Sequence, residues 1–228
     1  MAIRRFEDLP KEMQLDEIRP YFDMIRKKRL TLFFKRFLEL IVVIPCIILM
    51  LIPFLIIAVA IKIDSRGSVL FIQDRVGQYA KDFKIIKFRT MVTGANKLGS
   101  LTLKDDKRIT KIGKFIRYTR LDEFIQFINV LKGDMNLVGA RPELRCYVEH
   151  YTPEEMATFL LKPGMICKAS IEYRDENDLM ASAEDPEKMY LETILHDKMQ
   201  HNIDYLKVLS IREDIKILLK TIACVFVK

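Results

Sequence analysis

The sequence predicts an α+β protein, mostly helical with a small sheet, that carries one long apolar segment near its N-terminus. Residues 40–61 contain no charged side chain. Apolar residues recur at helical spacing in 121–131 and 211–228, whereas 69–72 and 84–91 have the composition of short strands. The chain has 228 residues, which is enough for one domain with a substantial core.

The charge and cysteine content narrow the function classes. A net charge of +7 suits an anionic partner, which could be nucleic acid, anionic lipid or a phosphorylated substrate. The four cysteines lack the spacing of a metal site and are interpreted as reduced thiols of a protein facing the cytosol. The three histidines have no partner one helical turn away, so a histidine metal site is not expected.

The N-terminal residues 1–36 form a polar, basic extension with a helical pattern. The basic run at 26–29 and the pair at 35–36 stand directly before the apolar segment. They fit either a solvated helix face or a patch held by anionic lipid at about 1 kcal/mol per charge, and their position favours lipid. We therefore divide the chain into this extension, a membrane segment at 37–62, and a domain at 63–228.

The apolar run at 40–61 is too long and starts too late for a signal peptide. At about 1.5 Å per residue it is long enough to cross a bilayer core. Pro45 and Pro53 should bend the helix, and basic residues on both sides give no clear orientation. Taken alone, the run favours a plain span, although a kinked helix that enters and leaves by the same face would also fit.

The stretch from Arg117 to Pro142 contains two adjacent carboxylates, Asp122 and Glu123, at the start of a predicted helix. Thr119 is a candidate N-cap and Gly133 a candidate stop. The positive end of the helix dipole would favour the ionised acids. An amphipathic helix with an acidic first turn is common, so this pattern alone does not indicate a function.

Several further segments have predicted structures. The segment at 108–117 interleaves basic and apolar residues, as does a helix lying on a membrane or one packed on a core. Residues 143–161 are predicted to be helical with Thr152 as a cap, and 162–164 to form a turn. The segment 211–228 is predicted to be a helix that packs on the domain or lies on the bilayer.

Four ordered motifs run through the chain: KFRTM at 87–91, LDE at 121–123, NVLKGDM at 129–135 and VGARP at 138–142. From about residue 37 to the C-terminus the chain resembles the bacterial sugar transferases, the monotopic polyprenyl-phosphate phosphoglycosyl transferases. It departs from that pattern at Ala140, where proline is usual. The Pro-Gly-x-Thr-Gly element is also altered, because Met-Ile-Cys follows Pro163-Gly164.

The resemblance implies transfer of a phosphosugar from a UDP-sugar to a polyprenyl (undecaprenyl) phosphate, with release of UMP. This reaction is the first membrane step of polysaccharide, lipopolysaccharide or glycoprotein glycan assembly. It implies a location in the bacterial inner membrane with the catalytic domain facing the cytosol, in contact with membrane lipid. It also implies that the membrane helix is re-entrant, with its kink at Pro53.

The resemblance assigns roles to the two carboxylates. Asp122 would be the nucleophile that forms an aspartyl phosphosugar intermediate. Glu123 would position or deprotonate a participant, or help Asp122 to hold Mg²⁺. Magnesium is the expected cofactor because it uses one or two carboxylates together with phosphate oxygens.

Basic residues would neutralise the two anionic reactants. The resemblance implies that Arg117 and Arg141 clamp the pyrophosphate. Lys87, Arg89 and Arg174 are further candidates for substrate binding, since they offer donors suited to phosphate. A solvated strand face is the ordinary alternative for Lys87 and Arg89.

Two other function classes compete with a transferase. A membrane-anchored binding or scaffold protein would use the basic surface only to contact lipid, but it leaves the ordered motifs unexplained. A nucleic-acid-binding protein is suggested only by the charge, and no recognised nucleic-acid motif is present, so no nucleic-acid partner is expected. The sequence leaves the sugar and the oligomeric state open, with a homodimer as one option.

Overall fold

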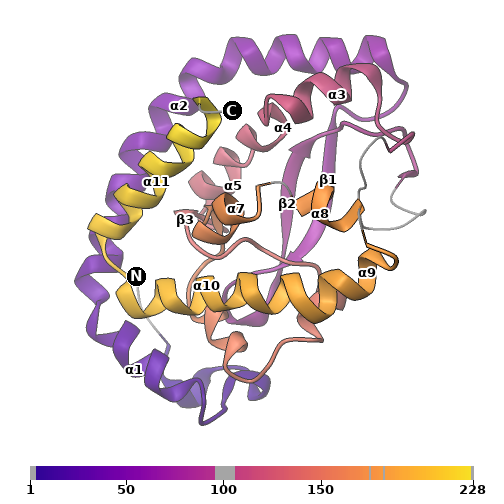
Figure 1. Ribbon diagram of the computed structural model, residues 1–228. Helices are drawn as coiled ribbons and strands as arrows, with labels where there is room; N and C mark the ends of the chain where they lie inside the picture. The colour runs from indigo at the N-terminus through magenta and orange to yellow at the C-terminus, as the bar shows by residue number, and fades with distance from the viewer. Residues whose placement is uncertain (1–3, 96–105, 175, 182, 227–228) are drawn as a thin grey trace.

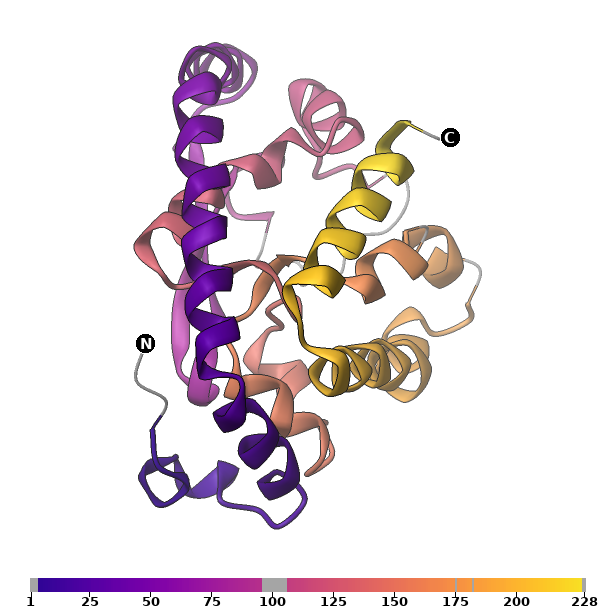
Figure 2. The same ribbon diagram turned by 90° about the vertical axis from the view of Figure 1, so that its left-hand side faces the viewer.

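The computed structural model describes residues 4–95, 106–174, 176–181 and 183–226. One long helix, α2 (Arg29–Asp64), runs along the outside of the molecule, and the other elements pack on its inner side (Figure 1). Figures 1 and 2 both show that α2 changes direction partway along its length. Pro45 and Pro53 lie within this helix and each lacks the backbone N–H of a regular turn.

Helix α2 is long and apolar enough to cross a membrane by length and composition. Only 6% of its most apolar 18-residue window is buried, so most apolar residues of this part are at least partly exposed. The helix is longer than the predicted apolar segment, because it begins at Arg29 rather than at residue 37. Lys35 and Arg36 therefore belong to the same helix as the apolar run.

The N-terminal extension is part of the protein core. It contains η1 (Phe6–Asp8), η2 (Lys11–Met13) and α1 (Arg19–Lys27). Met13 and Ile18 are fully buried, in a cluster that reaches the C-terminal helices. The prediction of a lipid-held basic patch is wrong for Lys35, which is only 4% exposed.

Both predicted strands are present and belong to one hairpin, although the first extends beyond residue 72 and the second ends at Phe88 rather than at residue 91. β1 (Leu70–Val76) pairs antiparallel with β2 (Asp82–Phe88), with η3 (Gln78–Ala80) in the turn. A second, parallel pair joins β3 (Asn136–Val138) to β4 (Gly164–Ile166).

The turn predicted at 162–164 is wrong at its last residue, because Gly164 begins β4. A Cβ atom on Gly164 would lie 2.1 Å from the backbone nitrogen of Gly139. The two strands approach so closely here that only glycine fits at this position.

The helix predicted from Leu121 breaks into two short helices. α3 (Lys111–Tyr118) precedes them, and α4 (Leu121–Phe124) and α5 (Phe127–Lys132) follow. The predicted cap at Thr119 is wrong, because its hydroxyl donates back to the carbonyl oxygens of α3. Arg120 instead adopts a left-handed conformation with φ 57° and turns the chain into α4. Gly133 ends α5 with φ 89°, as predicted.

The helix predicted over 143–161 is interrupted, and the N-cap of its second part, which begins at Glu155, is Glu154 rather than the predicted Thr152. Thr152 and Glu155 still exchange two hydrogen bonds, and in the longer one the Glu155 N–H donates to Thr152 Oγ1 at 3.4 Å. The Thr152 backbone N–H donates to Glu155 Oε2 at 2.7 Å. The C-terminal helix is confirmed through residue 226. The elements after β3, apart from β4, are α6 (Arg145–Val148), η5 (Glu155–Leu160), α7 (Lys168–Glu172), α8 (Glu176–Ala181), α9 (Pro186–Met189), the π-helical η6 (Tyr190–Ile194), α10 (Leu195–Val208) and α11 (Ile211–Phe226).

Candidate active site

Glu123 is the centre of a cluster of charges drawn from three parts of the chain. Lys87, on β2, places its Nζ atom 3.2 Å from Glu123 Oε1. Arg141, which follows β3, donates from Nη1 to Glu123 Oε2 at 3.1 Å and from Nη2 to Oε1. Both oxygens of Glu123 are therefore engaged by cations in a two-pronged contact with Arg141.

The two adjacent carboxylates have opposite electrostatic environments. Although burial alone would raise the pKa of Glu123, Arg141 and Lys87 together bring that pKa well below its ordinary value. Burial and the neighbouring charge of Glu123 raise the pKa of Asp122 above its ordinary value. Glu123 is thus held ionised, whereas Asp122 is the more basic carboxylate of the two.

Asp122 also differs from Glu123 in its contacts. No hydrogen bond to the Asp122 carboxylate is found within the part of the chain that the structure describes. The positive charges of Lys87, Arg117 and Arg141 oppose the increase in its pKa but do not cancel it. A partly buried carboxylate surrounded by cations but bonded to none of them is available to a ligand or a reacting atom.

Arg117 belongs to the same electrostatic environment. Its Nε atom donates to Thr90 Oγ1 at 2.9 Å. Thr90 lies just after β2, so this bond fixes the guanidinium relative to that strand. Burial lowers the pKa of Arg117, and the charge of Asp122 opposes this shift. The structure therefore brings together five of the predicted site residues: Asp122, Glu123, Lys87, Arg117 and Arg141.

Arg89 is engaged elsewhere. Its Nη1 donates to Arg66 O and Thr93 Oγ1, and its Nη2 donates to Ser65 O at 2.8 Å. These contacts join the end of α2 to the segment after β2, and the side chain is only 7% exposed. A substrate-binding role for Arg89 stays a prediction, and this geometry favours a structural role instead.

Arg174 lies in the turn that follows α7 and is partly buried. The contacts described for Asp122 and Glu123 do not include it. Its assignment to substrate binding therefore also stays a prediction.

Sequence reasoning missed residues that position the site. Arg75 donates to the carbonyl oxygen of Pro142 at 3.2 Å. The pKa of Lys87 is lowered mainly by burial, and the charges of Arg141 and Arg75 lower it further. Asn129 is fully buried and bonds to the β2 backbone through both ends of its amide, to Lys84 O and Ile86 N. The available signal for Asn129 was its place as the first residue of the NVLKGDM motif at 129–135.

The carboxylates of the site differ in whether they could bind Mg²⁺. Among the described residues there is no group of three His, Cys, Asp or Glu side chains suited to a metal. Magnesium needs only one or two carboxylates when substrate phosphates complete its shell. The Asp122 carboxylate, with no hydrogen bond from described residues, fits that requirement, whereas both oxygens of Glu123 already bind cations.

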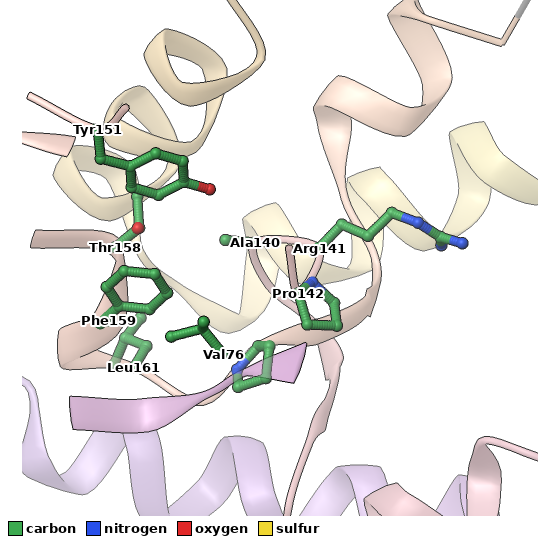
Figure 3. Close-up of a pocket in the computed structure, with 9 residues that line it drawn as sticks. Val76, Ala140, Arg141, Pro142, Tyr151, Thr158, Phe159 and Leu161 are labelled. Atoms are coloured by element: carbon green, nitrogen blue, oxygen red, sulfur yellow. The ribbon is translucent and has the colours of Figure 1, made fainter. Parts of the chain in front are cut away.

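A small cavity of about 10 Å³ lies behind Arg141. It is lined by Ala140, where the family usually has proline, and by Pro142, Tyr151 and Phe159. Figure 3 shows the Arg141 side chain extending away from the other lining side chains. The cavity has room for about one water molecule, so it is too small to hold a substrate.

The sequence is similar to those of known proteins over most of its length. A sequence model of the family described as bacterial sugar transferase matches residues 30–228. The chain is 38% identical over 169 residues to a UDP-N-acetylgalactosamine-undecaprenyl-phosphate N-acetylgalactosaminephosphotransferase of Aeromonas hydrophila, covering 72% of this chain and 37% of the relative.

Two further relatives carry related names. A UDP-glucose:undecaprenyl-phosphate glucose-1-phosphate transferase of Escherichia coli is 37% identical over 190 residues, which is 81% of this chain and 38% of the relative. A protein of the same name from Caulobacter vibrioides is 32% identical over 169 residues, 72% of this chain and 59% of the relative.

The matched region is less than two thirds of the length of each of these relatives. The family match, in contrast, covers nearly the whole of this chain and contains every predicted site residue. On that match, the chain belongs to the bacterial sugar transferase family.

Proposed function

We propose that the protein transfers a phosphosugar from a UDP-sugar to undecaprenyl phosphate and releases UMP. The observation that carries the proposal is the state of Asp122, a partly buried, basic carboxylate with no described hydrogen bond, beside a Glu123 saturated by Arg141 and Lys87. The names of the relatives supply the donor and acceptor classes.

The reaction proceeds in two displacements at one phosphorus atom. An Asp122 oxygen attacks the phosphorus that carries the sugar, a new P–O bond forms, and the bond to the second phosphate breaks to release UMP. An oxygen of undecaprenyl phosphate then attacks the same phosphorus and displaces the Asp122 carboxylate. The products are a sugar joined to the lipid by a pyrophosphate and the regenerated enzyme.

The cations around the pair neutralise charge at the reacting phosphates. Arg141 and Lys87 keep Glu123 ionised and place their own positive charges beside Asp122. Arg117, held by Thr90, adds a third cation that interacts electrostatically with Asp122. Preorganised cations of this kind stabilise the developing charge of phosphoryl transfer.

Magnesium would bind the Asp122 carboxylate together with the substrate phosphates. When bound, it would neutralise the charge on the pyrophosphate and orient it. The chain's own residues would supply one or two ligands, as this ion commonly requires.

In this proposal the membrane segment holds the site close to its lipid acceptor. In this proposal α2 is re-entrant, bends at Pro53, and leaves both of its ends and the active site at the cytosolic face of the inner membrane. The exposed apolar side chains along α2 support contact with lipid. The observed change of direction is compatible with this path.

The test is release of UMP from a panel of UDP-sugars by detergent-solubilised protein with undecaprenyl phosphate and Mg²⁺. We expect release by the wild type and by the control Asp16→Asn, which makes the same change at an exposed aspartate. Asp122→Asn should release none and form no sugar-dependent adduct detectable by intact mass. Activity in Asp122→Asn would overturn the nucleophile, and no release from any donor would favour a non-catalytic scaffold.

A further inference from the structure

Lys35 is a cation buried in the domain, although it belongs to the helix that carries the apolar membrane run. Its Nζ atom donates to Val138 O at 2.8 Å, Tyr205 Oη at 3.0 Å and Asp214 Oδ2 at 2.7 Å. All three ammonium donors are thus used, and the side chain is 3% exposed. These partners belong to β3, α10 and α11, so one residue of α2 joins three elements.

Glu39 lies one helical turn further along α2 and reaches the same strand. Its Oε1 atom accepts a hydrogen bond of 2.9 Å from the backbone N–H of Leu137, and the same oxygen is 3.6 Å from Lys35 Nζ. Lys35 and Glu39 therefore satisfy two consecutive residues of β3, as a neighbouring strand would.

Strand β3 leads directly into the active site. On one side it pairs with β4, and beyond its last residue the Gly139 N–H donates to Ile166 O and Ala140 O accepts from Gly164 N. Arg141 follows at once, with its guanidinium on Glu123. The position of β3 therefore determines the position of the Arg141 backbone.

A second contact links α2 to the other half of the site. Arg36 donates from Nη1 to Val130 O at 2.7 Å and from Nη2 to Leu131 O at 3.1 Å, at the carboxyl end of α5. The helices α4 and α5 carry Glu123 and the buried Asn129 that fixes β2.

The arrangement of charge along this part of α2 is the reverse of that on a surface helix. Lys35 and Glu39 point into the protein, whereas Phe33, Phe34 and Phe37 are more than half exposed. Burying a lysine and a glutamate costs free energy unless both are paired, so their inward placement requires partners such as those seen here.

We propose that Lys35 and Glu39 are positioning residues, a buried anchor through which α2 fixes β3 and thereby Arg141 for the reaction proposed above. The inference rests on the proposed function for its effect on turnover, but not for its effect on the structure. Lys35 and Glu39, which precede the apolar run, would thus hold the active site in position rather than bind lipid.

Two substitutions of Glu39 separate the effect of side-chain length from the effect of charge. Glu39→Gln keeps the length of the side chain and an oxygen acceptor for the Leu137 N–H, but removes the charge. Glu39→Asp keeps the charge but shortens the side chain, so that it loses the Leu137 N–H. Glu213→Asp makes the same shortening in an ion pair on α11, with Lys216 at 3.0 Å, and serves as the control.

The measurements are amide hydrogen exchange of full-length protein in detergent and UMP release. For Glu39→Asp we expect faster exchange at Leu137 with unchanged exchange in the β1–β2 hairpin, and a fall in kcat of about tenfold or more with a smaller change in KM. Glu39→Gln should retain most of the protection and activity, and Glu213→Asp all of both.

Unchanged exchange at Leu137 in Glu39→Asp would overturn the anchor, as would equal behaviour of the Gln and Asp variants. Uniformly faster exchange throughout the protein would show general destabilisation and would equally contradict it. If the wild type released no UMP, the proposed function would fail, while the exchange of β3 would still test the anchor on its own.

Discussion

Two clusters of buried charge, one around Lys35 and one around Glu123, differ in how their donors and acceptors are satisfied. Lys35 is a single cation whose three donors all reach oxygen atoms. Around Glu123, the cations Lys87, Arg117 and Arg141 outnumber the two carboxylates, and Asp122 has no described hydrogen bond. A buried cation whose donors are all used indicates a structural role, whereas an excess of cations beside an available carboxylate indicates a site for anionic substrates.

The comparison predicts that Lys35→Met causes the largest loss of stability. The substitution leaves Asp214 without its 2.7 Å partner and Val138 O without a donor in a buried place. Removing one partner of a buried ion pair costs about 3–5 kcal/mol. Urea unfolding in detergent measures the loss of unfolding free energy, and a loss below about 1 kcal/mol would contradict the structural role of Lys35.

Arg141→Gln should cost less stability but much more activity. Glu123 would keep Lys87 at 3.2 Å, so about 1–3 kcal/mol is expected from the lost charged hydrogen bonds. UMP release should fall by about 100-fold or more, because a preorganised charge beside the reacting phosphate is lost. Wild-type turnover with lowered stability would place Arg141 in the structural class with Lys35.

Asp122→Asn should stabilise the protein while abolishing turnover. The pKa of Asp122 is raised in the folded state by burial and by Glu123, so its ionised form disfavours folding. The gain should be about 0.5–2 kcal/mol at neutral pH. It should vanish as the pH falls below the ordinary pKa of 3.8, where Asp122 is protonated in both states.

Glu123→Gln has the opposite sign and provides the control for that pH dependence. The folded-state pKa of Glu123 is lowered, so its ionised form contributes stability above its ordinary pKa of 4.5, and that contribution is lost as the pH falls toward the folded-state value. Unfolding curves from pH 7 to pH 3 should therefore converge for wild type and Glu123→Gln on acidification. Parallel curves would mean that Arg141 and Lys87 do not hold Glu123 ionised.

Lys216→Met should have the smallest effect. Lys216 and Glu213 form an ion pair of 3.0 Å on α11, and the Lys216 side chain is 54% exposed. Exposed pairs contribute about 0–1 kcal/mol because water and salt screen them. A loss as large as that of Lys35→Met would show that burial is not what distinguishes the two lysines.

The elements that depend on local pattern were predictable, and those that depend on a single backbone angle were not. The hairpin strands and the helix beginning at Ile211 follow from the spacing of apolar residues. The break between α4 and α5 and the left-handed Arg120 carry no such signal. Arg120 is not glycine, so nothing in its identity marks a positive φ.

The sequence by itself determined the family, the apolar helix, and the group of Asp122, Glu123, Lys87, Arg117 and Arg141, because ordered motifs and residue types survive without coordinates. Only the tertiary structure decided which cations bind Glu123, that Arg89 is engaged with backbone carbonyls, and that Lys35 turns inward. A basic residue before an apolar run has the same composition whether it meets lipid or protein. Which of these it meets depends on partners such as Val138 and Asp214, which lie more than a hundred residues away in the chain.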